Sequence, residues 1–198
     1  MTTPCARFSV VDLDAPGGAW AEVAMPASSS PVRLIRLHAD AATGASVSLV
    51  GFPPGWTRPG TGHYLCAEEF AVLRGRISVS GTAYPAGACA RLPALATRTA
   101  SAVGADGCLA VAWFSGPPRW RDGIADGVAD GAPAAAGEPE PAGSVLLGSL
   151  AELPEPPPGT ADFDMTFLDA RKWAYVPHGH PFPDLPGRVL VRRRPSGS

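Results

Sequence analysis

Apolar and polar residues alternate with a period of two through most of residues 1–115, and turn residues interrupt this alternation at short intervals. Ala45, Val47 and Leu49 alternate with two serines, which is the pattern of a strand with one face in water. Further strands are expected over residues 69–73, 77–80, 88–92 and 108–114. Because no long helical pattern separates these segments, the sequence predicts an all-β fold, an antiparallel barrel or sandwich.

Composition excludes several classes of function. Apolar residues make up 45% of the 198 residues, enough for a substantial core, and the formal net charge of −2 argues against nucleic acid as a partner. No apolar run is long enough to span a bilayer, and the first residues lack the pattern of a signal peptide. The four cysteines show no CxxC spacing and are expected to be reduced. We therefore expect a cytoplasmic protein with neither a nucleic-acid nor a membrane partner.

The composition changes after residue 117, where Asp-Gly pairs, alanines and prolines become frequent. Such a segment buries too little apolar surface to offset the entropy of ordering it. We therefore expect three parts: a barrel in residues 1–118, a flexible Pro/Ala/Gly-rich linker in residues 119–160, and an appended C-terminal segment in residues 161–198.

Two shorter patterns refine this division. Residues 144–153 are expected to form a short helix or strand that docks on the barrel. Residues 167–194 weakly echo residues 10–40, so the C-terminal segment either packs on the barrel or is a shortened second repeat. Coincidence in a biased composition explains the echo equally well.

The residues with the clearest chemical meaning are a histidine and a carboxylate five positions apart, His63 and Glu68, which lead into an expected hairpin. Both side chains transfer protons near neutral pH in suitable surroundings, and both bind divalent metals. We expect His63 and Glu68 to point into the barrel. Strand alternation turns Glu69 the other way, where it is expected to be a surface carboxylate.

This region resembles the cupin superfamily, the RmlC-like fold, and within it the ChrR-like cupins. The likeness rests on short motifs within residues 31–116, at residues 40–45, 53–56, 68–75 and 84–87. The resemblance implies an antiparallel jelly-roll barrel that holds a small-molecule ligand. It also implies a homodimer, because cupin barrels tend to pair through exposed strand edges.

The resemblance also implies a metal centre, but the motif is degenerate here. His63 and Glu68 match two of the four expected ligands, and Thr61 stands where the first histidine is expected. With two ligands we expect at most a weakly held zinc, iron or manganese ion. A barrel that binds no metal is equally compatible with this sequence. His178 and His180, in a proline-rich loop, are the candidates that would complete the site.

Arg98 lies near the position of the missing histidine of the second cupin motif. An arginine there would place a fixed cation in the barrel, suited to bind a carboxylate or phenolate with two parallel hydrogen bonds. The alternative is that Arg98 points to solvent. Aromatic residues are also expected to line the ligand site: Tyr64, Trp56 and Trp113.

Three functions are compatible with these features. The first, which we favour, is an enzyme acting on a small metabolite, of the cyclase, isomerase, dehydratase or decarboxylase type, with His63 and Glu68 as an acid–base pair. Dioxygenation is disfavoured because it requires a firmly held redox metal. The second is a non-catalytic small-molecule-binding or sensor protein, and the third is a structural subunit of a pathway complex.

Overall fold

The computed structural model describes residues 8–125, 144–153 and 161–195. The chain divides into two compact units, residues 18–137 and residues 1–17 with 138–198. We call their described parts the barrel unit (residues 18–125) and the sheet unit (residues 8–17, 144–153 and 161–195). Within these residues the elements are strands, apart from one 3-10 helix, Leu150–Glu152, which confirms the all-β prediction. None of the described residues forms a helix with the length and apolar character needed to cross a membrane.

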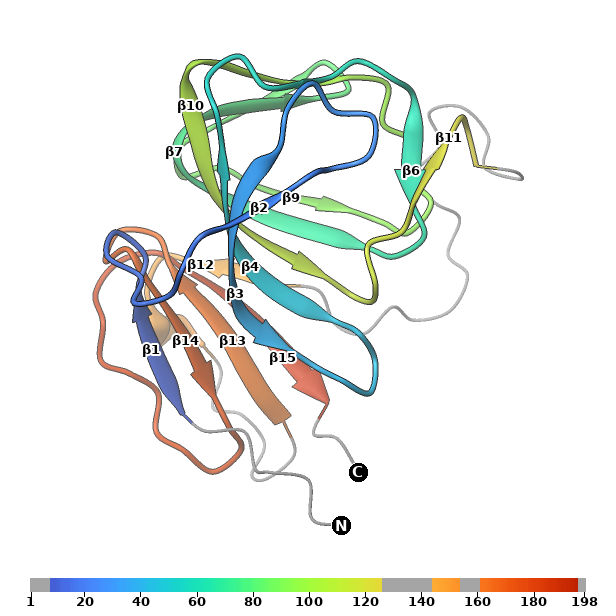
Figure 1. Ribbon diagram of the computed structural model, residues 1–198. Helices are drawn as coiled ribbons and strands as arrows, with labels where there is room; N and C mark the ends of the chain where they lie inside the picture. Colours follow the sequence, from blue (N-terminus) through green and yellow to red (C-terminus); the bar gives the residue numbers. More distant parts are fainter. Residues whose placement is uncertain (1–7, 126–143, 154–160, 196–198) are drawn as a thin grey trace. The chain divides into compact units, whose positions relative to one another are not determined.

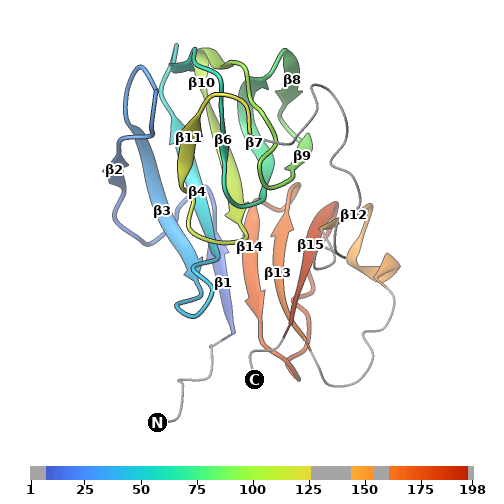
Figure 2. The ribbon, with the colours of Figure 1, turned by 90° about the vertical axis from the view of Figure 1, so that its right-hand side faces the viewer.

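The barrel unit consists of antiparallel strands that wrap around a common interior (Figures 1 and 2). The main sheet has the order β2-β3-β4-β10-β7-β8, with β5 also paired to β10 and β9 to β7, and β6 pairs with β11 in a separate two-stranded sheet. The strands are β2 (Ala21–Val23), β3 (Val32–Ala39), β4 (Ser46–Phe52), β5 (Thr57–Arg58), β6 (Gly62–Tyr64), β7 (Glu68–Val79), β8 (Thr82–Pro85), β9 (Cys89–Leu92), β10 (Ser101–Phe114) and β11 (Trp120–Asp122).

Residues 69–73 and 77–80, which were expected to form two strands, belong to a single strand. Strand β7 runs through Gly75 without a break, and Gly75 adopts the left-handed conformation with φ of 74°. Opposite it, the register of β10 shifts between Val103 and Cys108. A glycine in this conformation bends a strand at a bulge without ending it.

Alternate residues of β7 and β10 form the interior of the barrel unit. Phe70 and Val72 on β7 face Ala112 and Ala110 on β10. All four residues are buried, and Phe70, Val72 and Ala112 belong to a hydrophobic cluster that also includes Phe114. Glu68 is paired across from Phe114, so it shares this inward face. The predicted inward direction of Glu68 therefore follows from the same alternation that builds the core.

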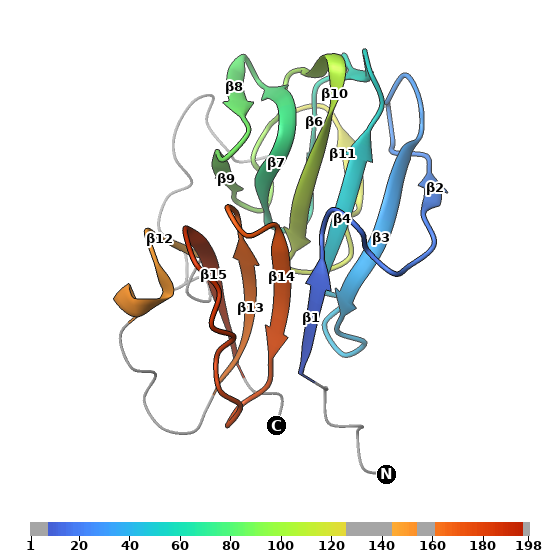
Figure 3. The ribbon, with the colours of Figure 1, turned by 90° about the vertical axis from the view of Figure 1, so that its left-hand side faces the viewer.

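The sheet unit is a single antiparallel sheet with the order β1-β14-β13-β15-β12 (Figure 3). One face carries an apolar cluster that includes Phe163, Met165 and Phe167, packed with Val176 and Val189. Its strands are β1 (Ser9–Asp12), β12 (Val145–Leu147), β13 (Ala161–Phe167), β14 (Lys172–Val176) and β15 (Val189–Pro195).

These pairings divide the chain differently from the expected boundaries of 1–118, 119–160 and 161–198. Strand β1, expected in the barrel, pairs with β14, and the short element expected to dock on the barrel is β12, which pairs with β15. Strand β11, expected in the linker, pairs with β6 of the barrel unit. Alternation reveals a strand but not its partner, which is why these assignments differed. The rest of the expected linker, residues 126–143 and 154–160, lies outside the described residues.

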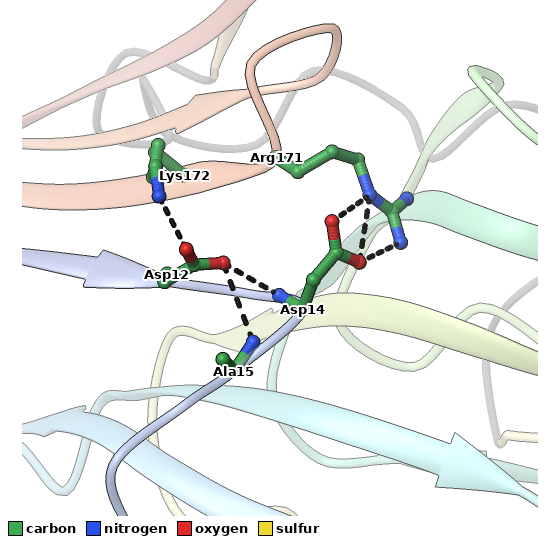
Figure 4. Close-up of polar contacts among 5 residues, drawn as sticks. All are labelled: Asp12, Asp14, Ala15, Arg171 and Lys172. Atoms are coloured by element: carbon green, nitrogen blue, oxygen red, sulfur yellow. Dashed lines mark hydrogen bonds and ion pairs between the residues drawn. The ribbon is translucent and has the colours of Figure 1, made fainter.

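Polar side chains connect the end of β1 to the β13–β14 turn (Figure 4). Lys172 forms an ion pair with Asp12, and Arg171 donates from Nη2 to Oδ1 of Asp14 at 2.8 Å. Asp12 Oδ1 also accepts from the backbone N–H groups of Asp14 and Ala15 at 3.0 and 3.3 Å. Because the hydrogen bond from Lys172 favours the ionised form, the pKa of Asp12 lies below its usual value.

Candidate functional site

Two arginines are buried in the barrel unit, Arg58 with 4% and Arg98 with 2% of its surface exposed. Arg58 ends β5, paired across from Ser101 of β10. Arg98 precedes β10, and its backbone is held by two hydrogen bonds with Gly62 of β6, at 2.8 and 2.9 Å. Buried arginine is rare unless it is paired, so the partners of these two side chains decide what the site can do.

Arg98 has one carboxylate partner. It donates from Nη2 to Glu68 Oε2 at 2.8 Å, and its guanidinium lies 4.7 Å from the centroid of the Tyr64 ring. Its Nε and Nη1 atoms are buried and have no hydrogen-bond partner among the residues that the structure describes. The prediction that Arg98 points inward is therefore supported by the geometry, and the alternative of a solvent-exposed side chain is not.

Arg58 is surrounded by aromatic rings, and no carboxylate of the described part of the chain is bonded to it. Its Nη2 donates to the hydroxyl of Tyr64 at 3.0 Å, while its Nε is buried without a partner. The guanidinium lies 4.4 Å from the ring centroid of Trp120 and 5.6 Å from that of Trp56. Cation–π contacts of this kind stabilise a buried guanidinium but leave its N–H donors unsatisfied.

The charges of this cluster do not balance. Among the described residues, Glu68 is the carboxylate bonded to this pair of arginines, so even with Glu68 ionised the two guanidinium groups carry one positive charge more than the carboxylate balances. Burial raises the pKa of Glu68, although Arg98 and Arg58 oppose that rise. Burial also raises the pKa of the Tyr64 phenol, so this hydroxyl stays neutral and supplies no counter-charge at neutral pH.

His63 is not part of this cluster, contrary to the prediction. In the β6–β11 pair, Tyr64 lies opposite Trp120 and His63 opposite Arg121. Tyr64 and Trp120 contact the barrel interior, so alternation turns His63 to the other face of that pair. There the Nδ1 atom of His63 lies 3.1 Å from the carbonyl oxygen of Gly123. The expected acid–base pair of His63 and Glu68 is therefore not formed.

Of the three aromatic residues predicted to line the ligand site, two face the barrel interior and one does not. Tyr64 and Trp56 belong to the buried interior cluster, and Trp56 donates from Nε1 to the carbonyl of Ser30 at 3.0 Å. Trp113 alternates with Phe114, which faces the interior, and so lies on the opposite face of the sheet. Trp113 is therefore removed from the ligand site.

Glu69 points away from the interior as predicted, but it is not a surface carboxylate. It is paired across from Trp113 on β10 and is 4% exposed. Arg91, its neighbour on β9, forms an ion pair with it at 3.5 Å.

The residues present do not fit the metal centre that the cupin resemblance implies. Among residues 8–125, 144–153 and 161–195, no group of three or more histidine, cysteine, aspartate or glutamate side chains could hold a metal ion. Arg98 engages Glu68, and His63 faces away from it. His178 and His180 are exposed in the sheet unit, where the ring of His180 stacks on Phe8.

Two residues of the cluster, Arg58 and Trp120, were not predicted from the sequence. Arg58 follows the inward Trp56 by two positions, and residues two apart in an extended chain share a face. That spacing was the signal for Arg58. Trp120 carried no comparable signal, because it lay within the expected linker.

Comparisons with known proteins agree with this architecture. No protein-family model and no curated protein matches the sequence. Among solved structures, the chain is similar to a protein from Nostoc punctiforme described as a candidate dioxygenase, with a TM-score of 0.68, 14% identity, and coverage of 98% of this chain and 84% of the other. The protein therefore has the cupin fold, as the sequence resemblance predicted.

Two further solved structures match more weakly. A candidate acetylacetone dioxygenase from Methylibium petroleiphilum has a TM-score of 0.49 and 16% identity, covering 59% of this chain and 82% of the other. The complex of SigE with the anti-sigma ChrR from Rhodobacter sphaeroides has a TM-score of 0.39 and 19% identity, covering 50% of each chain.

Proposed function

We propose that the barrel unit binds a small organic acid, whose anionic group is held by Arg98 with the help of Arg58. The observation that carries this proposal is that Nε and Nη1 of Arg98, a residue that is 2% exposed, have no hydrogen-bond partner in the described part of the chain. Unsatisfied buried donors of a charged group cost free energy unless a ligand or water occupies them. An anion satisfies both the donors and the charge.

The geometry of Arg98 suits a carboxylate. Its Nη2 carries two hydrogens, and within residues 8–125, 144–153 and 161–195 Glu68 Oε2 is the acceptor bonded to that atom. Whichever hydrogen Glu68 takes, the other points along an edge shared with Nε or with Nη1, and both of these are without partners. One complete two-donor edge of the guanidinium thus remains for a carboxylate, the geometry that arginine recognises best.

The aromatic surroundings favour an acid with an apolar body. Tyr64 packs edge-on against Phe114 and Trp120, with ring centroids 5.3 and 5.1 Å apart. Ligand sites typically combine such apolar walls with a few polar groups that orient the ligand. An anionic group would also offset part of the positive charge of the two guanidinium groups.

Replacing Arg98 tests this function. We expect wild-type protein to bind at least one of four sodium salts, acetate, benzoate, succinate or phosphate, in isothermal titration calorimetry. Arg98→Met should weaken that binding about 10- to 100-fold, the range expected when a charged hydrogen-bonding group is lost. Arg98→Lys, which keeps the charge but not the two-donor edge, should give an intermediate loss.

Arg74→Met is the matched control, because Arg74 is exposed on β7. It should bind the same anion as tightly as the wild type does. Equal affinities of the wild type and Arg98→Met would contradict the proposal, as would the absence of binding to all four anions.

Glu68 supports a second candidate, an enzyme of the isomerase, dehydratase, cyclase or decarboxylase type. A buried carboxyl group with a raised pKa beside a bound acid is suited to proton transfer. Glu68 would then act alone, because His63 is turned away from it. Turnover of a bound acid that Glu68→Gln abolishes while binding persists would favour this candidate over simple binding.

A further inference from the structure

One carboxylate, that of Glu68, already occupies part of the guanidinium that the proposed ligand would use. Arg98 Nη2 and Glu68 Oε2 are 2.8 Å apart, and the unpartnered Nε and Nη1 belong to the same planar group. A ligand carboxylate on the free edge would place one of its oxygens on the second hydrogen of Nη2, roughly 5 Å from Glu68 Oε2, given ordinary hydrogen-bond lengths. Two negative charges at this separation repel strongly where water is excluded.

We propose that Glu68 takes up a proton when an anion binds to Arg98, so that the ligand enters the barrel together with one proton. This inference rests on the proposed function. Protonation removes the repulsion between the two carboxylates. It also turns Glu68 into a hydrogen-bond donor toward the ligand. Glu68 thereby determines at which pH an acid is held.

The groups that face Glu68 favour this response. Arg98 and Arg58 are the cations near it, and Tyr64 and Cys66 are its other titratable neighbours. Burial raises the pKa of Glu68, and the two arginines oppose that rise in the free protein. A bound anion would neutralise part of their effect and would add a like charge, and both changes raise the pKa of Glu68 further.

Tyr64 and Cys66 are poorer candidates for the proton exchange. Burial raises the pKa of both groups, so both already carry their protons in the free protein at neutral pH. A group that is protonated before binding takes up no proton on binding. Glu68 is therefore the member of the cluster that can change its protonation state.

Calorimetry in pairs of buffers with different ionisation enthalpies measures this coupling directly. With whichever of the four anions the wild type binds, we expect uptake of up to one proton per anion at pH 7.5. The dissociation constant should rise up to tenfold for each pH unit above the pKa of Glu68 in the free protein. Glu68→Gln should bind the anion with no proton uptake, and its affinity should be nearly constant from pH 6 to pH 9.

Glu69→Gln is the matched control, because Glu69 is adjacent in sequence but faces the opposite side of β7. It should keep the wild-type proton uptake. Anion binding by the wild type without proton uptake would overturn this inference but leave the proposed function intact. This measurement uses the wild type only, so it does not require any variant to fold. Proton uptake that persists in Glu68→Gln would also overturn it. If none of the four anions binds, the proposed function itself fails.

Discussion

Replacing Gly75 with alanine is expected to lower the free energy of unfolding of the barrel unit by roughly 2–5 kcal/mol, combining backbone strain with overpacking. Gly75 has φ of 74°, and an added Cβ would lie 2.0 Å from the carbonyl oxygen of Gly107. That oxygen belongs to the backbone of β10, so it cannot move aside as a flexible side chain could. Urea denaturation followed by circular dichroism measures the loss.

Gly81→Ala separates the two contributions. Gly81 has nearly the same backbone conformation, with φ of 80°, but an added Cβ would have no neighbour within 4 Å. This variant should lose only about 1–2 kcal/mol, the cost of the left-handed conformation for alanine. Equal losses in both variants would show that the close approach of β7 and β10 at Gly75 has no energetic consequence.

The second large effect is expected at Asp164, in the middle of β13. Its side chain is 6% exposed, and neither carboxylate oxygen has a hydrogen-bond partner among the described residues. The Nε atom of Arg194 lies 3.5 Å from Oδ2. Burial raises the pKa of Asp164 to about 7, with Arg194 lowering it and Asp162 raising it by smaller amounts.

This raised pKa makes the stability of the protein depend on pH. The usual value for the aspartate carboxyl is 3.8, so the folded state binds the proton more tightly than the unfolded state does. The stability that the proton confers is complete below the unfolded-state pKa and is lost as the pH rises through the folded-state pKa, near 7. Between pH 5 and pH 8 the loss should be about 2–3 kcal/mol.

Asp164→Asn tests this expectation, because asparagine does not titrate. The difference in unfolding free energy between the wild type and Asp164→Asn should fall by that amount from pH 5 to pH 8, measured by urea denaturation. Asp184→Asn, at an exposed position of the sheet unit, is the control. If the difference in unfolding free energy between the wild type and Asp164→Asn did not vary with pH, Asp164 would have the same pKa in the folded and the unfolded protein, which would contradict the prediction.

Several features of the candidate site followed from sequence alone, because they depend on neighbours along the chain. The direction of Glu68 toward the interior and of Glu69 away from it required only the alternation of one strand. The direction of Glu68 agrees with the structure. The orientation of Arg98 was left open, because its place near a ligand position of the cupin pattern allowed an inward and a solvent-facing side chain equally. In the structure Arg98 is buried and bonded to Glu68.

Other features depended on residues far away in sequence. The orientation of His63 is set by the register of β6 with β11, in which Tyr64 lies opposite Trp120. Residues 119–122 were expected to be part of the linker, so the sequence did not predict that they would pair with the strand that contains His63. Without that pairing, alternation says only that His63 and Tyr64 face opposite ways, and not which of them faces the interior.

The sequence by itself determined the all-β class, the position of most strands and the inward carboxylate of Glu68, since period-two alternation is a local property of the chain. Only the tertiary structure decided that β1 joins β14, that His63 leaves the site and that Arg58 enters it. The physical reason is that strand pairing and burial depend on which segments meet in space. That choice is made by packing over the whole domain, so no local pattern contains it.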